Sequence, residues 1–161
     1  MLLLDKTIIS IRGRYTMQVS EILNQKGRDI YSVKPDETVY NTIAKMAELN
    51  VGALLVMEQD RLAGIISERD YRNKVILQGR TSKTTVVKEI MTGQVIQVKP
   101  SDTVNLCMQL MTEHKIRHLP IVDQEKVVGV VSIGDLVKTI IAKQKVEIDS
   151  LRNYIGGGYP G

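Results

Sequence analysis

The sequence predicts an α+β fold made of two β-α-β-β-α repeats related by a pseudo-twofold axis. Three observations predict it. A long stretch of the chain repeats itself at a fixed offset, each copy has apolar residues at helical spacing, and each copy then has two apolar runs of strand length around a polar turn. Because one such unit has too small a sheet to bury both faces, the two copies are expected to pack together.

The internal repeat keeps one spacing throughout. A shift of 65 residues places residues 30–76 on residues 95–141 without a gap. So many matches in one register indicate a duplicated unit. The matching pairs include Val33 with Val98, Pro35 with Pro100, Leu54 with Leu119, Gly64 with Gly129, Ser67 with Ser132 and Asp70 with Asp135.

Each copy is expected to contain the same elements. A short strand ends at a Lys-Pro step, because proline cannot donate to a strand ladder. Asp36 or Ser101 is then expected to cap a helix. The strands are expected at 30–33, 53–57 and 62–66 in the first copy and at 95–98, 119–122 and 127–131 in the second. Helices are expected at 17–27 and 84–91, and from Ser67 to about Gln78 and from Ser132 to about Lys145.

These elements divide the chain into four parts. Residues 1–20 form an N-terminal extension and residues 21–83 the first repeat with its linker. Residues 84–146 form the second repeat, and residues 147–161, which are rich in glycine, are expected to be a flexible tail.

Composition and charge exclude several classes of protein. No stretch approaches the roughly 20 apolar residues that span a membrane. Residues 1–28 carry +3 of the net charge of +4, and no basic run interleaves with aromatic residues, so nucleic acid is not expected as a partner. A single cysteine, Cys107, fits a reducing compartment, and the cytoplasm is the predicted location. A degenerate transit peptide within residues 1–20, which carry Lys6, Arg12 and Arg14, stays open.

The stretch from Gly64 to Asp70, repeated from Gly129 to Asp135, is the candidate site. In each copy an apolar strand leads to a serine at the start of a helix, and an aspartate follows three residues later on the same side. The start of a helix favours anions such as phosphate, and a carboxylate beside it can accept bonds from the two neighbouring hydroxyls of a ribose.

The same pattern has a second interpretation. A serine followed three residues later by an acidic residue is also a capping box, which only stabilises the start of a helix. The glycine three residues before each serine leaves room either for a ligand or for another backbone segment. Both interpretations are open from the residues alone.

In combination, these motifs resemble a known family. The tandem repeats, the Lys-Pro-x-x-Thr-Val openings, the run Ile116-Arg117-His118-Leu119-Pro120-Ile121-Val122-Asp123 and the two Ser-x-x-Asp phrases resemble a pair of CBS domains (cystathionine-β-synthase repeats), also called a Bateman module. The resemblance covers about residues 20–146. Residues 68–83, with the phrases Ile-Arg-His-Leu-Pro and Ser-Ile-Gly-Asp, are similar to a stand-alone CBS-pair subfamily found in bacteria and organelles.

The resemblance implies a ligand and a set of binding residues. Such pairs bind AMP, ADP, ATP, S-adenosylmethionine or NAD(H) in clefts between the repeats and usually form homodimers. One cleft would use Ser67 and Asp70 with Ile116, Arg117, His118 and Pro120, and the other Ser132 and Asp135 with Val51, Gly52, Ala53 and Leu54. Val33 and Val98, with Lys34 and Lys99 beside them, would line the adenine, and Arg69, Arg72 and Arg117 are candidates to bind phosphates.

The two clefts are expected to be unequal. Leu55 stands where the second copy has Pro120, and Gly52 and Ala53 stand where it has Arg117 and His118. The cleft lined by the second repeat's strand, which would include Asp70, is therefore predicted to be better equipped for phosphate.

We therefore predict a regulatory module that senses energy or redox state through an adenine nucleotide and signals to an unknown downstream protein. No catalytic and no metal-binding residues are predicted, because the chain shows no paired base and nucleophile, no metal-ligand spacing, no P-loop and no GxGxxG motif. A scaffold with vestigial clefts and a nucleotide-processing enzyme are the alternatives. A homodimer is expected through apolar residues on the helices, namely Leu106, Leu110, Tyr71, Val75, Leu136 and Ile140.

Overall fold

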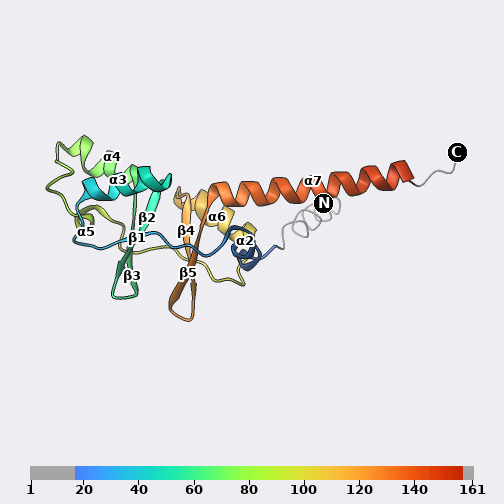
Figure 1. The fold of residues 1–161 in the computed structure, drawn as a ribbon, viewed down its shortest axis with the longest axis horizontal. Helices are drawn as coiled ribbons and strands as arrows, with labels where there is room; N and C mark the ends of the chain where they lie inside the picture. Colours follow the sequence, from blue (N-terminus) through green and yellow to red (C-terminus); the bar gives the residue numbers. More distant parts are fainter. Residues whose placement is uncertain (1–16, 158–161) are drawn as a thin grey trace, which may run out of the picture. The chain divides into compact units, whose positions relative to one another are not determined.

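The structure, a computed structural model, describes residues 17–157 (Figure 1). Its α+β content follows the predicted order of elements. The elements are α2 (Val19–Lys26), β1 (Ser32–Val33), α3 (Val39–Leu49), β2 (Ala53–Glu58), β3 (Arg61–Ser67), α4 (Glu68–Lys74), the 3-10 helix η1 (Ile76–Gln78), α5 (Val87–Ile90), α6 (Val104–His114), β4 (His118–Asp123), β5 (Lys126–Ser132) and α7 (Ile133–Gly157). The predicted N-terminal extension lies almost wholly outside the described residues.

The chain forms two compact units that do not follow chain order. Among the described residues, unit 1 contains residues 17–27, 100–119 and 131–157, and unit 2 contains residues 28–99 and 120–130. The predicted boundaries at residues 21–83 and 84–146 follow the chain. In the structure the short helices that precede the repeats are exchanged between the units, and residues 120–130 of the second repeat belong to unit 2.

Corresponding hydrogen bonds show this exchange in both units. In unit 2 the start of α5 binds the start of α3, with Val87 N donating to Glu37 O and Val39 N donating to Thr85 O, both at 2.9 Å. In unit 1 the start of α2 binds the start of α6, with Val19 N donating to Asp102 O and Val104 N donating to Met17 O, also at 2.9 Å. Each leader helix therefore stabilises the repeat that it does not directly precede.

The strands form one three-stranded and one two-stranded sheet. In the first sheet β1 is parallel to β2, and β2 is antiparallel to β3, whereas the second contains β4 and β5. The predicted strand 95–98 is reduced to a single parallel bridge between Val98 and Ile121. In the first repeat Leu55 N donates to Tyr31 O at 3.2 Å. Pro120 occupies the position of Leu55 in the second repeat and has no N–H, so it cannot make this bond.

Tight turns connect the hairpin strands. The central residues of the first turn, Gln59 and Asp60, have φ of 48° and 64°, and Gln124 and Glu125 in the second have φ of 48° and 66°. Positive φ at both central residues is the requirement of a type I′ turn, whose twist matches that of the strands. The turns therefore hold β2 against β3 and β4 against β5, as the polar tetrapeptides predict.

The caps of the first helices differ from the prediction. Asp36 and Ser101 were expected to cap α3 and α6, but the helices begin later, after Thr38 and Thr103. The hydroxyl of Thr38 accepts from Asn41 N at 3.1 Å, and that of Thr103 accepts from Leu106 N at 3.2 Å. The expected cap Asp36 belongs instead to a turn, in which Glu37 N donates to Lys34 O.

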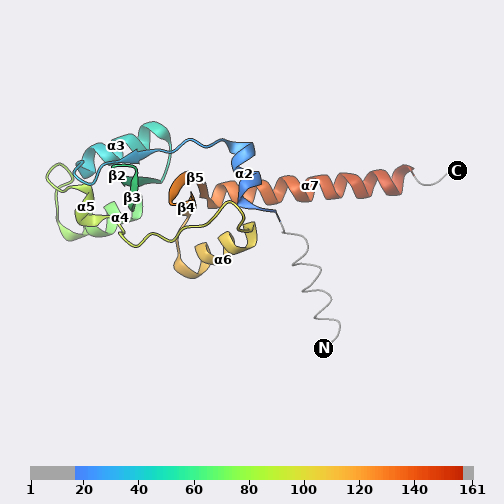
Figure 2. The same cartoon turned by 90° about the horizontal axis from the view of Figure 1, so that it is seen from below.

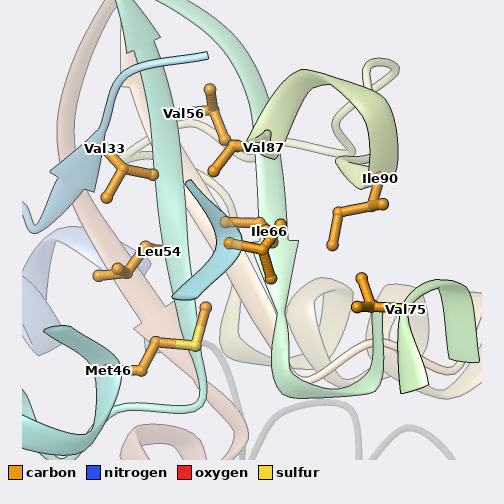
Figure 3. Packing of buried hydrophobic residues seen from close by; sticks show 9 residues of the cluster. Val33, Met46, Leu54, Val56, Ile66, Val75, Val87 and Ile90 are labelled. Carbon is orange, nitrogen blue, oxygen red and sulfur yellow. The ribbon is translucent and has the colours of Figure 1, made fainter. Parts of the chain in front are cut away.

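Unit 2 has a core of aliphatic side chains between the sheet and its helices (Figure 3). Leu54 and Val56 point from one face of β2 into this core, and Leu55, on the other face, is also buried. Burial of both faces explains why β2 is apolar without alternation. The core residues are Val33, Val39, Met46, Leu54, Val56, Ile66, Val75, Val87 and Ile90.

The last helix departs from the prediction. It was expected to end at about Lys145 and to be followed by a flexible tail, but α7 is 25 residues long and continues to Gly157. Residues 147–157 are thus helical, and only residues 158–161 of the predicted tail lie outside the described part. Good helix formers such as Glu147 and Leu151 continue the helical pattern up to the first glycine.

Two residues of the predicted homodimer surface are in the interior instead. Val75 is 1% exposed and Leu136 is fully buried. Their apolar side chains belong to the protein's own core, so they cannot contact a second copy. Leu106, Leu110, Tyr71 and Ile140 are partly buried, and the homodimer stays a prediction.

Candidate functional site

The first candidate site is the junction between β3 and α4, which we call the first entrance (Ser67, Asp70 and Gly52). Ser67 pairs with Ala53 across the sheet, and Glu68 N donates to Gly52 O at 3.0 Å. The serine and the aspartate are therefore fixed beside the beginning of β2. This arrangement follows from the sequence, because the strand ends where the serine begins the helix.

Asp70 is held by its own chain in the first entrance. Its Oδ2 accepts from Ser67 N at 2.9 Å and from Ser67 Oγ at 3.1 Å, and Asp70 N donates back to Ser67 Oγ at 3.2 Å. Its Oδ1 lies 3.1 Å from Lys74 Nζ, one turn later on the same helix. Lys74 also donates to Ile90 O at 2.8 Å. Both carboxylate oxygens of Asp70 are thus engaged.

The second entrance (Ser132, Asp135 and Lys26) lies between β5 and α7. Asp135 Oδ2 accepts from Ser132 N at 2.8 Å, and Asp135 N donates to Ser132 Oγ at 3.1 Å. Lys26, in the last turn of α2, donates from Nζ to the same Oδ2 at 2.6 Å. The strand β4 is adjacent, because Ile133 N donates to Arg117 O at 2.9 Å.

The charges of the second entrance influence one another. Burial raises the pKa of Asp135, but the hydrogen bonds from Lys26 and Ser132 and the charge of Lys26 outweigh burial, and its pKa lies below the ordinary 3.8. Burial lowers the pKa of His118 below 6.5; Lys26 and Arg117 lower it further, whereas Asp135 opposes them. The carboxylate is therefore charged and the imidazole neutral at pH 7.

Both interpretations of the Ser-x-x-Asp pattern have support in this geometry. Each aspartate bonds the backbone N–H of its serine and completes a capping box. Neither carboxylate is sealed, because the side chains of Asp70 and Asp135 are 15% and 21% exposed. A capped helix and a partly exposed carboxylate coexist at each entrance.

The glycine before the first entrance is explained by a backbone segment and not by a ligand. A Cβ at Gly64 would lie 2.7 Å from Thr92 O and 2.8 Å from Met91 Sδ. The neighbouring Ile65 exchanges two hydrogen bonds with Thr92, of 3.0 and 2.9 Å. Gly64 is therefore required for the close approach of the segment that follows α5.

Comparison with known proteins identifies the fold family. A sequence model of the CBS domain matches residues 19–76 and 87–142, which together are most of the chain. The chain belongs to the CBS-domain family. This confirms the predicted family and the predicted α+β fold with two CBS repeats.

The relatives of this CBS pair agree in sequence and in structure. The CBS domain-containing protein CBSX3, mitochondrial, from Arabidopsis thaliana is 43% identical over 156 residues, covering 91% of this chain and 76% of the relative. The structure of a CBS-domain protein from Burkholderia ambifaria has a TM-score of 0.78 and 53% identity, covering 80% of this chain and 96% of that one. A CBS domain pair crystallised with 5′-methylthioadenosine and S-adenosyl-L-methionine has the same fold, with a TM-score of 0.70 and 23% identity over 80% of this chain and 98% of its own.

The predicted site residues of the CBS pair fall into two groups by exposure. Val33, Leu54, Val98 and Pro120 are buried, and Lys34, Arg69, Arg72 and Arg117 are exposed. The remaining predicted residues are partly buried, namely Ser67, Asp70, Ser132, Asp135, Val51, Gly52, Ala53, Ile116 and His118.

The structure brings some of these predicted residues together within a unit. Gly52 and Ala53 lie beside Ser67 in unit 2, and Arg117 and His118 lie close to Asp135 in unit 1. The predicted association of Asp70 with Ile116, Arg117 and His118 joins residues of different units, as does that of Asp135 with residues 51–54. Both associations stay predictions.

Sequence reasoning missed Lys26. This residue is 109 positions from Asp135, and when Val19 of α2 is aligned with Val87 of α5 its counterpart is Gln94, beyond the end of α5, so the repeat gives no signal for it. Only the exchange of the leader helices brings α2 to the second entrance. The exchange could not be read from chain order.

Other reactive groups have ordinary structural surroundings. Cys107 is fully buried, and burial, with a smaller contribution from the charge of Asp102, raises its pKa to about 11. Between residues 17 and 157, no group of three or more histidine, cysteine or acidic side chains is arranged to hold a metal ion. None of the helices in that range is long and apolar enough to cross a membrane.

Proposed function

We propose that this CBS pair is a regulatory module that binds an adenosine-containing ligand at its helix entrances. The carboxylates of Asp135 and Asp70 would accept hydrogen bonds from the two neighbouring hydroxyls of a ribose. The observation that carries this proposal is the position of Asp135, a charged and partly exposed carboxylate at the start of the long helix α7. The positive end of the helix dipole, at the start of α7, also favours an anion nearby.

The second entrance is the better prepared of the two. The bonds of Asp135 described above use only Oδ2, so Oδ1 can accept from a hydroxyl, whereas Asp70 uses both oxygens. Lys26 and the exposed Arg117 supply positive charge for phosphate oxygens. This preference differs from the sequence-based one, which favoured the cleft containing Asp70, because Arg117 belongs to the same unit as Asp135.

This chemistry defines the class of the ligand but not the individual compound. AMP, ADP, ATP, NAD(H) and S-adenosylmethionine all contain the ribose that the aspartates would bind. The CBS pair crystallised with two adenosine derivatives supports this class, because it has the same fold. A ligand that binds one conformation more tightly than another would shift their populations, and a downstream protein would respond to the shift. We place this activity in a homodimer in the cytoplasm.

Calorimetry with AMP, ATP, NAD, NADH and S-adenosylmethionine tests the proposal directly. Asp135→Asn should weaken binding of the responding nucleotide by about tenfold or more, since a charge-assisted bond is worth roughly 1.5–3 kcal/mol. Asp70→Asn should remove or weaken a separate binding event. Melting curves complete the test, because a ligand of the folded state raises the melting temperature.

Glu89→Gln is the matched control. Glu89 also accepts from the first N–H of a helix, at 2.8 Å from Val86 N, and also pairs with a cation, at 2.7 Å from Arg80. It is not part of either entrance, so its replacement should leave nucleotide affinity unchanged. If no nucleotide binds the wild-type protein, the scaffold alternative is favoured; if one is converted during the titration, the enzyme alternative is favoured.

A further inference from the structure

The helix α7 carries a row of exposed apolar side chains from Val137 to Ile155. Within its unit α7 continues beyond α2 and α6 in both views (Figures 1 and 2). Residues 144–156 are all exposed. The exposed fraction in the row ranges from 44% for Val137 to 72% for Ile155. Solvated helices normally place polar residues at such positions, so the row requires an explanation.

The spacing of this row is that of a coiled coil. Val137, Ile141, Gln144, Ile148, Leu151 and Ile155 follow one another at intervals of four, three, four, three and four residues. An average of 3.5 residues defines a heptad repeat and a left-handed seam. Ile141, Ile148 and Ile155 occupy the a positions, and Val137, Gln144 and Leu151 occupy the d positions. We call these six residues the α7 seam.

We propose that the α7 seam pairs with the α7 seam of a second copy of this chain, as a parallel two-stranded coiled coil. Isoleucine occupies all three a positions and leucine one of the three d positions, and isoleucine at a with leucine at d is the combination that favours two parallel strands. The proposal goes beyond the proposed function, since it needs no nucleotide. Four of the six seam residues, from Gln144 to Ile155, also lie outside the family match, which ends at residue 142.

Charges beside the seam favour the parallel direction. In a parallel pair the g position of one helix faces the e position of the next heptad on the other helix. Glu147 at g then faces Arg152 at e, and the opposite charges meet twice in the symmetric dimer. An antiparallel pair would instead place the e positions together, and these are Lys138, Lys145 and Arg152. Like charges at such a contact are destabilising.

Cysteine cross-linking of the full-length protein tests this pairing. In a parallel pair in register, Ile148 meets its own counterpart, so Ile148→Cys should form a disulfide-linked dimer under mild oxidation. Val146 is the matched control: it is 66% exposed and two residues away, but it lies at an f position outside the seam. Val146→Cys should cross-link at least about tenfold more slowly. The native Cys107 does not interfere, because it is buried and its thiol, with a pKa of about 11, stays protonated.

A charge exchange tests the direction of the pairing. In the Ile148→Cys background, Glu147→Arg should slow cross-linking about three- to tenfold at low salt, because it places two arginines opposite each other. Adding Arg152→Glu should restore the original rate. Residues 147 and 152 are five apart and do not face each other on one helix, so the restoration reports a contact between helices.

Several outcomes would overturn the inference. Equal cross-linking of the two cysteine variants, or no cross-linking of Ile148→Cys, would mean that the seams do not meet. Slow reaction of Ile148→Cys with a maleimide in a monomer would mean that residues 1–16 or another protein cover the seam. Failure of the double charge exchange to restore the rate would exclude the parallel direction. Nucleotide binding is measured separately and can fail without affecting any of these results.

Discussion

Lys26 and Asp135 are 109 residues apart in the sequence, yet Nζ of the lysine lies 2.6 Å from Oδ2 of the aspartate. The contact links the end of α2 to the beginning of α7. In the first entrance the corresponding cation is Lys74, from the same helix as Asp70. The two repeats therefore neutralise equivalent aspartates with lysines of different origin.

Replacing Lys26 should destabilise the fold modestly. Lys26→Met removes a partly exposed ion pair, and such pairs contribute about 0.2–1 kcal/mol. We expect a loss in this range in urea unfolding. For Lys74→Met we expect a loss of at least about 0.3–0.5 kcal/mol, the contribution of a helical ion pair, because Lys74 also donates to Ile90 O. An unchanged midpoint for Lys26→Met at low salt would show that the pair does not stabilise the protein.

The contribution of the Lys26–Asp135 pair should disappear in acid. The pKa of Asp135 is lowered in the folded protein, so its stabilisation is present above the ordinary 3.8 and is lost as pH falls through the folded-state value. The difference in unfolding free energy between wild type and Lys26→Met should therefore be constant from pH 7 to 5 and shrink below 3.8. A difference that persists at pH 2 would contradict this.

His118 should make stability fall between neutral and mildly acidic pH. Its folded-state pKa is lowered, so below 6.5 the unfolded chain binds a proton that the folded protein does not. Stability then decreases as pH falls below 6.5, by at most about 1.4 kcal/mol per pH unit for one proton. His118→Gln should remove this decrease from melting curves, and the same change at the exposed His114 should not.

Glycines near the two entrances should respond oppositely to alanine. Gly64→Ala should destabilise the protein by about 1–3 kcal/mol, because the new methyl group would collide with Thr92 O. Gly134→Ala adds a methyl group 3.6 Å from Ser132 Oγ, an ordinary contact, within a helix. Its effect should be neutral or stabilising by up to about 1 kcal/mol. Equal destabilisation of the two variants in urea unfolding would disprove the explanation given for Gly64.

The sequence was sufficient for most elements of the fold. The offset of 65 residues and the strand and helix periods predicted the hairpin strands within one residue and the starts of the central helices within two. The caps were misplaced because Asp36 and Thr38 are both good capping residues, and only the bonds of the preceding turn decide between them. The end of α7 was predicted too early: beyond Lys145 the helix continues with exposed residues that belong to no core.

The sequence predicted the placing of serine and aspartate at the two candidate entrances, and it missed Lys26 beside Asp135. Local spacing sets Ser67 relative to Asp70, and Ser132 relative to Asp135, because three residues form almost one helical turn. Lys26 depends on which leader helix packs on which repeat, and that choice is made by backbone bonds between distant segments. Backbone N–H and C=O groups occur in almost every residue, so composition and spacing cannot predict which of them will bond to each other.

Because the leader helices are exchanged, the parts of each unit are synthesised at different times. The amides of Val19 and Ser20 donate to the carbonyls of Asp102 and Pro100, so α2 leaves the ribosome long before its partners exist. A nascent chain that has reached residue 83 holds the first repeat without its own stabilising helix, which is α5. A gene divided at the linker would therefore encode two incomplete fragments. The first would lack α5, which binds α3, and the second would lack α2, which binds α6.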